Sequence, residues 1–178
     1  SWQQQVDQVA KWRTPAITPQ SSFYEHYVAP LVRGGRKKAV VIISDALRYE
    51  VAEELASRIR GENKYGARID AILGNLPSYT QLGMASLLPH KTLAHSAGGD
   101  PVLVDGQASN GTANRSKILA AVGGSAIQAT DFVKMKPAER RDLYASNQVL
   151  YMYHDTIDAT GDKAVSEHRT FKAAADAI

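Results

Sequence analysis

The 178-residue sequence contains no cysteine. Disulfides, thiolate metal ligands and cysteine nucleophiles are therefore excluded, and any bound metal must be held by carboxylate, imidazole or hydroxyl groups. The sequence also lacks an apolar run of the roughly 18 residues that a membrane span requires, and its first residues do not show the charged-then-apolar pattern of a signal peptide. These absences predict a cytoplasmic protein that is not associated with a membrane.

The residues that are present indicate a folded domain. Hydrophobic residues make up 44% of the chain and charged residues 22%, which are proportions typical of soluble globular proteins. The formal net charge of +3 permits an anionic partner but is too small to argue for one.

The first 35 residues differ from the rest. Apolar side chains recur there at helical spacing in two stretches separated by prolines, and Gly34-Gly35 ends the second stretch. We therefore predict an N-terminal helical segment over residues 1–35, followed by the main domain over residues 36–178.

Strand-like and helix-like segments alternate after this helical segment. The predicted strands cover residues 40–44, 67–73, 102–104, 125–129 and 148–153. The predicted helices cover residues 47–61, 81–88, 115–122, 137–144 and 164–178. This alternation predicts an α/β fold, a three-layer sandwich with a mainly parallel sheet.

The apolar run 39–44 leads directly into Asp45. A run without polar alternation predicts a strand buried on both faces, and its carboxyl end is where open α/β sheets bind their ligands. Asp45 is therefore a candidate metal ligand. The alternative is that its carboxylate caps the helix that follows, which is the commoner role of Asp at such a boundary.

A second candidate segment is Pro77-Ser78-Tyr79-Thr80, which precedes the predicted helix 81–88. A hydroxyl at the start of a helix suits phosphoryl chemistry, because the unpaired amides there favour both an alkoxide and a bound phosphate. Ser78 or Thr80 could equally cap the helix, and the spacing is compatible with both roles.

A third segment follows the predicted strand 148–153. Within nine positions it contains His154, Asp155, Asp158 and Asp162. Histidine and carboxylates at the end of a buried strand are the donors that a metal site without sulfur requires. The alternative is a solvated acidic loop.

These three motifs, in this order, resemble the PglZ family of bacterial phage-exclusion (BREX) systems, whose core is similar to that of the alkaline phosphatase superfamily. The segments that carry the likeness are 40–50, 76–80 and 153–162. The resemblance implies an alkaline-phosphatase-like fold with Asp45 as a metal ligand and Thr80 as the metal-bound nucleophile. It also implies that His154 and Asp158 are ligands, although the superfamily has Asp first and His second at this spacing. The implied cofactors are divalent metal ions, zinc or alternatively manganese or magnesium.

The function that the resemblance implies is metal-dependent hydrolysis of a phosphomonoester or phosphodiester within a phage-defence system. The implied partners are a phosphate ester substrate, nucleic acid among the candidates, and other phage-defence proteins. Thr80 would attack phosphorus, and Arg48 would neutralise the phosphoryl oxygens, unless Arg48 is simply an exposed helical residue.

Later ligands of the superfamily site, an Asp-His pair and a further His, have no counterpart in the sequence. We therefore expect a truncated domain, cut from a longer protein, that is inactive alone. The alternative function is a non-catalytic, phosphatase-like scaffold for defence-complex partners or nucleic acid, which the exchanged order of His154 and Asp158 favours.

Overall fold

The computed structural model describes residues 1–99, 101–163 and 167–178. At its centre is a parallel sheet of three strands in the order β2-β8-β7. The strands are β2 (Ala39–Ser44), β7 (Gly124–Gln128) and β8 (Val149–His154). The central strand, β8, is buried along its whole length except at His154, which is expected of a strand with a neighbour on each edge.

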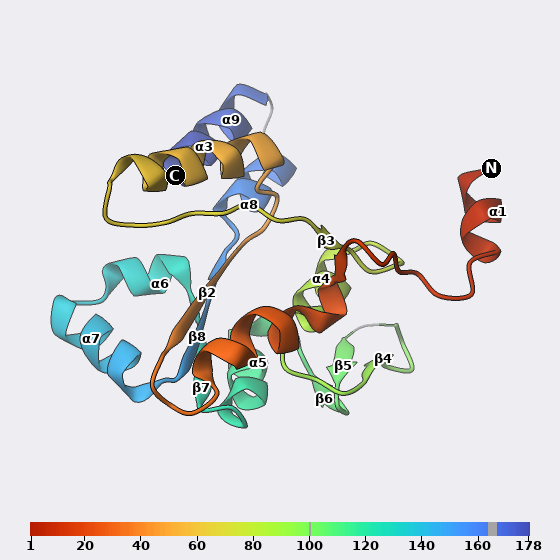
Figure 1. The fold of residues 1–178 in the computed structure, drawn as a ribbon, viewed down its shortest axis with the longest axis horizontal. Coiled ribbons are helices and arrows are strands. Elements are labelled where there is room, and N and C mark those ends of the chain that lie inside the picture. The colour runs from red at the N-terminus through yellow and green to blue at the C-terminus, as the bar shows by residue number, and fades with distance from the viewer. Residues whose placement is uncertain (100, 164–166) are drawn as a thin grey trace.

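Helices lie on both sides of this sheet, as Figure 1 shows. One side carries α6 (Ala129–Lys134) and α7 (Pro137–Ser146), and the other carries α2 (Ala29–Val32), α4 (Thr80–Ser86) and α5 (Gly111–Ala120). Beyond the carboxyl ends of the strands lie α3 (Tyr49–Gly61), α8 (Thr156–Lys163) and α9 (Glu167–Asp176). The predicted α/β fold with a parallel sheet is confirmed.

One face of the sheet, which we call the core face, carries the main hydrophobic core. Strand alternation directs Val41 and Ile43 of β2 and Tyr151 and Tyr153 of β8 to this face. The Tyr151 hydroxyl donates a 2.6 Å hydrogen bond to the carbonyl of Leu87, which ties the end of α4 to the sheet. The buried residues of the surrounding helices that join this core are Tyr24, Val28, Ala29, Leu82, Ala85, Leu88, Ile118 and Leu119.

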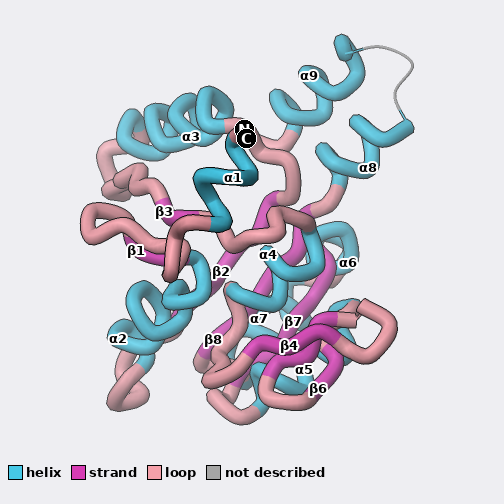
Figure 2. Tube along the Cα trace, turned by 90° about the vertical axis from the view of Figure 1, so that its right-hand side faces the viewer, coloured by secondary structure: helices cyan, strands magenta, loops and turns pink. Residues whose placement is uncertain are grey.

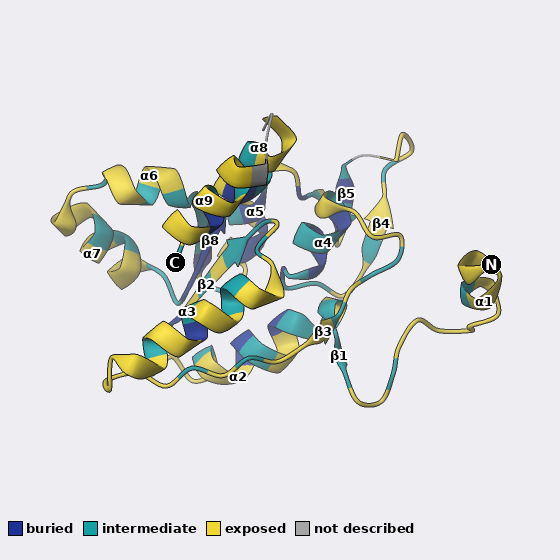
Figure 3. Ribbon diagram, turned by 90° about the horizontal axis from the view of Figure 1, so that it is seen from above, coloured by how far each residue is buried: buried dark blue, intermediate teal, exposed yellow. Residues whose placement is uncertain are grey.

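The opposite face, which we call the open face, is covered only in part. Leu150 and Met152 of β8 are buried there, but their register partners on β2, Val40 and Ile42, are 45% and 65% exposed. The prediction that β2 is buried on both faces is therefore wrong. The physical reason is that no helix among the described residues makes extensive contact with the open face of β2, and Figure 3 shows the buried positions gathered around β8 instead.

A smaller antiparallel sheet lies beside α4 and α5 (Figure 2). It consists of β4 (Leu93–His95), β5 (Val102–Val104) and β6 (Gln107–Ala108). The predicted strand at 102–104 is confirmed, and its Val102 and Val104 are fully buried.

The predicted strand at 67–73 is wrong for most of its length. Only β3 (Ile72–Leu73) is extended in a ladder, and it pairs with β1 (Thr18–Pro19), outside the central sheet. The preceding residues include Arg68 and Asp70, which form an exposed ion pair with each other. Charged neighbours that remain in solvent do not provide the apolar face that would hold a strand in a sheet.

The N-terminal segment contains two different parts. The helix α1 (Trp2–Asp7) stands away from the rest of the chain in Figures 1 and 3. The turns at η1 (Gln20–Ser22) and η2 (Tyr24–Val28) instead pack with α2 into the core. None of the helices in the described part of the chain combines the length and apolarity that crossing a bilayer requires.

Candidate functional site

Asp45 is the first residue after β2, and its backbone N–H donates a 2.9 Å hydrogen bond to the carbonyl of His154. The chain then turns at Ala46, whose φ of 61° lies in the left-handed region that residues other than glycine seldom adopt. The next helix, α3, begins only at Tyr49, with Arg48 at its N-cap. Asp45 therefore does not cap this helix, and the capping interpretation is wrong.

The Asp45 carboxyl group lies close to other acids. Burial is the largest cause that raises its pKa above the ordinary value, followed by the negative charge of Asp158 and then that of Asp155. The Ala46 N–H and the positive charge of Arg115 act in the opposite direction. Asp158 is therefore close enough for its charge to disfavour ionisation of the half-buried Asp45 carboxyl group.

Asp158 lies in the first turn of α8, a helix that begins two residues after β8. The segment is therefore a helix and not a loop, with Asp155 and Asp162 exposed and Asp158 partly buried. The helix forms because no glycine or proline interrupts the chain between β8 and Asp158, and because Ile157, which is 2% exposed, anchors its first turn in the interior.

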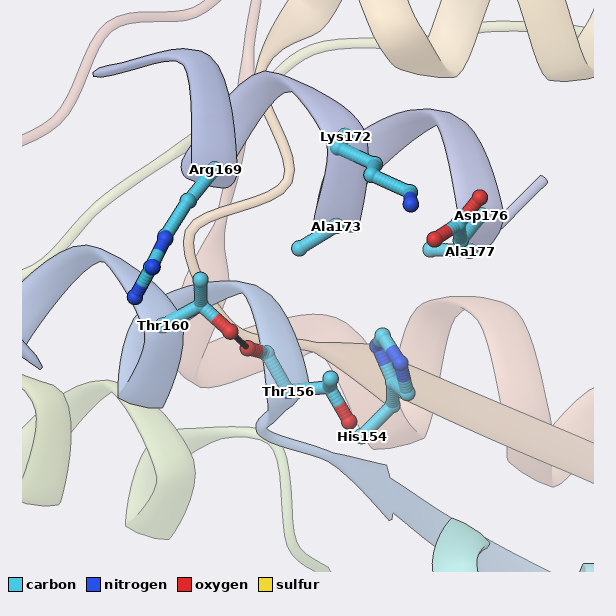
Figure 4. Close-up of a pocket in the computed structure, with 8 residues that line it drawn as sticks. All are labelled: His154, Thr156, Thr160, Arg169, Lys172, Ala173, Asp176 and Ala177. Atoms are coloured by element: carbon cyan, nitrogen blue, oxygen red, sulfur yellow. Dashed lines mark hydrogen bonds between the residues drawn. The ribbon is translucent and has the colours of Figure 1, made fainter. Parts of the chain in front are cut away.

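His154 is the last residue of β8. It is the register partner of Ser44, whose hydroxyl is 2.9 Å from His154 Nδ1, and strand alternation places this pair on the open face. The imidazole lines a cavity of about 310 Å³ between α8 and α9. Figure 4 shows His154 at one wall of this cavity, with Lys172 and Asp176 projecting from α9 opposite. Within the described part of the chain, His154 does not join Asp45 and Asp158 in a group that could hold a metal ion.

Thr80 is the first residue of α4 and is exposed. The N-cap of this helix is Tyr79, and no side chain caps it, so neither Ser78 nor Thr80 has the capping role. The helix packs on the core face through Leu82 and through the hydrogen bond from Tyr151 to Leu87. Thr80 is therefore carried by an element that lies on the core face of the sheet.

Arg48 is directed toward α9. Its guanidinium lies 5.8 Å from the centre of the Phe171 ring, and both side chains line a cavity of about 280 Å³ between α3 and α9. This contact engages Arg48 away from the core face.

Arg115 and Tyr153 were not among the predicted site residues. Arg115 is only 7% exposed, its guanidinium lies 4.3 Å from the centre of the Tyr153 ring, and its Nε donates a 2.8 Å hydrogen bond to the Ser109 carbonyl. The sequence carries a signal for this burial, because Arg115 shares one helical face with Ile118 and Leu119, at i, i+3 and i+4. A charged residue on an apolar helix face is a candidate for a buried functional group.

The described residues do not provide a complete set of metal ligands. Across residues 1–99, 101–163 and 167–178, no group of three or more His, Asp or Glu side chains is gathered closely enough to hold a metal ion. Asp45 and Asp158 provide oxygen donors of the kind that divalent cations bind, but two carboxylates alone do not complete a coordination sphere. The fit to a metal is therefore incomplete in this chain.

The motifs that contain these residues are also found in known proteins. Residues 23–178 match a family described as the BREX system PglZ alkaline phosphatase-like domain. The chain belongs to the PglZ family. The predicted resemblance is thus confirmed, together with its alkaline-phosphatase-like fold. No solved structure matches the chain.

Two curated relatives of this PglZ chain are similar over 169 residues, which is 94% of its length. The alkaline phosphatase-like protein BrxZ of Escherichia coli O9:H4 (strain HS) is 46% identical, and the alkaline phosphatase-like protein PglZ of Bacillus cereus (strain H3081.97) is 41% identical. The chain spans only 20% of the length of each relative. The activity of the full-length protein is therefore a subject for proposals.

Proposed function

We propose that this chain carries the nucleophile and the first metal ligands of a metal-dependent phosphohydrolase that is completed in the full-length PglZ protein. The observation that supports this most is that neither Asp45 nor Thr80 caps a helix. Asp45 instead lies at the carboxyl end of β2, where the charge of Asp158 acts on it, and Thr80 begins a helix that packs on the core face. The side chains of Asp45 and Thr80 are therefore available for metal binding and catalysis.

The reaction would proceed in two steps. Thr80 Oγ attacks phosphorus in line while the ester oxygen departs, which forms a covalent phospho-threonine, and water then releases phosphate and restores the hydroxyl. A divalent metal ion, when bound, lowers the pKa of the hydroxyl and neutralises the phosphoryl charge. Asp45 and Asp158 would provide carboxylate ligands, and the remaining ligands would come from other parts of the full-length protein.

The roles of His154 and Arg48 rest on the resemblance alone. His154 is hydrogen-bonded to Ser44 on the open face, and Arg48 lies over Phe171. We therefore assign the essential chemistry to Asp45, Asp158 and Thr80. The substrate would be a phosphate ester, nucleic acid among the candidates, and the partners would be other BREX defence proteins. The chain alone would be inactive or nearly so.

A second candidate function is a non-catalytic, phosphatase-like scaffold that binds defence-complex partners or nucleic acid. The position of His154 favours it, because the histidine of the third motif does not join Asp45 and Asp158 in a ligand group among the described residues. The two functions differ in whether Asp45 and Asp158 bind a metal in the full-length protein.

The substitution Thr80→Ala in the full-length protein tests the catalytic proposal. Hydrolysis of an aryl phosphate or phosphodiester should fall by at least about a thousandfold, since the nucleophile is lost, while zinc or manganese binding measured by titration stays nearly intact. Thr130→Ala, at an exposed threonine of α6, is the matched control. Unchanged turnover in Thr80→Ala would move the nucleophile elsewhere, and metal binding that does not depend on Asp45 or Asp158 would favour the scaffold.

A further inference from the structure

Two neighbouring strands each place a polar side chain at the carboxyl edge of the core face. Gln128 ends β7 and is the register partner of Tyr153 on β8. Tyr153 is in turn the partner of Ile43 on β2. Register partners share a face, so Gln128 and Tyr153 lie side by side. Asp45 lies in the turn that follows β2, where the charge of Arg115 acts on its carboxyl group.

The polar groups at this edge are buried without partners. Tyr153 is 3% exposed, and its hydroxyl has no partner at hydrogen-bonding distance and angle within the described part of the chain, although the Arg115 guanidinium lies over its ring and acts on the hydroxyl. The Oε1 of Gln128 is likewise buried without a partner. Such groups cost free energy unless something binds them. A tyrosine hydroxyl is a hydrogen-bond donor at neutral pH.

Arg115 places a positive charge over this edge. Its one hydrogen bond within the described residues goes to a neutral acceptor, the Ser109 carbonyl, and none of the ion pairs found there involves its guanidinium. A guanidinium that is 7% exposed without a paired anion is unfavourable, and its Nη groups can bind two oxygens of a phosphate at once.

We propose that Arg115 and Tyr153 form an oxyanion site that holds the phosphoryl group of the substrate beside Asp45. This inference rests on the proposed function and names the residues that bind its substrate. A bound phosphoryl group supplies the acceptor oxygens and the negative charge that these donors lack. The site lies at the carboxyl ends of parallel strands, where open α/β sheets bind their ligands. Arg48, the arginine that the resemblance favours, is exposed and engaged with Phe171.

Binding of inorganic phosphate to the full-length protein, measured by calorimetry, tests this site directly. Arg115→Met should raise the dissociation constant about tenfold or more, because a charge-assisted hydrogen bond is lost. Tyr153→Phe should raise it several-fold. Arg141→Met and Tyr144→Phe, at exposed positions on α7, are the matched controls and should leave it unchanged.

The result that overturns the proposal is a full-length protein that does not bind phosphate, or one whose affinity is unaffected by both Arg115→Met and Tyr153→Phe. If Arg115→Met does not fold, phosphate binding is measured instead with the conservative variants Arg115→Lys and Tyr153→Phe. Unchanged phosphate affinity in both of these variants overturns the proposal. Failure of the proposed function gives a different pattern, in which phosphate binding depends on Arg115 while Thr80→Ala does not reduce turnover.

Discussion

The two faces of the central sheet differ in packing and in the chemistry that they carry. On the core face, β2 and β8 are covered by α4 and α5, and Tyr151 is fully buried. On the open face, Ile42 is 65% exposed although its partner Met152 is buried. Strands of parallel sheets are usually covered on both faces. Of β2 and β8, only β8 is buried on both faces in this way.

This difference separates the candidate site residues. Tyr153 and Arg115 lie at the edge of the packed face, where rigid elements can hold reacting groups in a fixed geometry, and the charge of Arg115 acts on Asp45. His154 and Ser44 lie on the other face, beside the cavity between α8 and α9. Residues that are adjacent in the sequence motif are therefore not adjacent in the site.

The largest expected effect comes from Ile43→Ala compared with Ile42→Ala. These neighbouring isoleucines share a strand, but Ile43 packs against the core while Ile42 is exposed. Ile43→Ala should lower the free energy of unfolding by about 2–3 kcal/mol, and Ile42→Ala by less than about 0.5 kcal/mol, as measured by urea denaturation of this chain. Equal losses would show that the open face is also packed.

A smaller effect is expected from Asp45→Asn, which removes a half-buried carboxylate close to the charge of Asp158. The pKa of Asp45 is raised in the folded state, so wild-type stability falls as the pH rises through that raised value. Asp45→Asn should therefore raise the free energy of unfolding at pH 7, by no more than about 1 kcal/mol because the group is half-exposed, and the gain should vanish near pH 3.

Urea denaturation at pH 3, 5 and 7 measures this dependence. Asp142→Asn, at an exposed acid on α7, controls for the loss of one negative charge away from Asp158. A destabilising effect of Asp45→Asn at pH 7 would contradict the repulsion and would assign the carboxylate a structural role.

Local sequence patterns predicted the elements that depend on local signals. The apolar runs gave β2 and β8, and the spacing of Leu82 and Ala85 gave α4 within one or two residues. The strand predicted over 67–73 is wrong because Arg68 and Asp70 stay in solvent, so most of the segment has no apolar face to hold it in a sheet. The predicted burial of β2 on both faces is wrong because the covering of a sheet depends on distant parts of the chain.

The site was predicted only in part, because the burial of a side chain and the direction in which it points are properties of the assembled fold. The position of Asp45 after a buried strand could be read from the sequence. Arg115 is 70 residues away along the chain, and only the packing of α5 on Tyr153 brings it to the same edge. The motif also gave no sign that His154 does not join Asp45 and Asp158 in a ligand group among the described residues, because the turn at Ala46 and the start of α8 are set by tertiary structure.

The smallest expected effect is that of Ser44→Ala, which tests whether the two faces are chemically separate. Loss of the hydrogen bond to His154 Nδ1 should cost about 0.5 kcal/mol, at the low end for such bonds, because the pair is partly exposed. The ring nitrogen signals of His154 in NMR spectra should shift, whereas metal affinity in the full-length protein should match that of Ser57→Ala, an exposed control on α3. Weaker metal binding in Ser44→Ala alone would mean that His154 and Asp45 act in one site across the sheet edge, and the division between the faces would then describe packing but not chemistry.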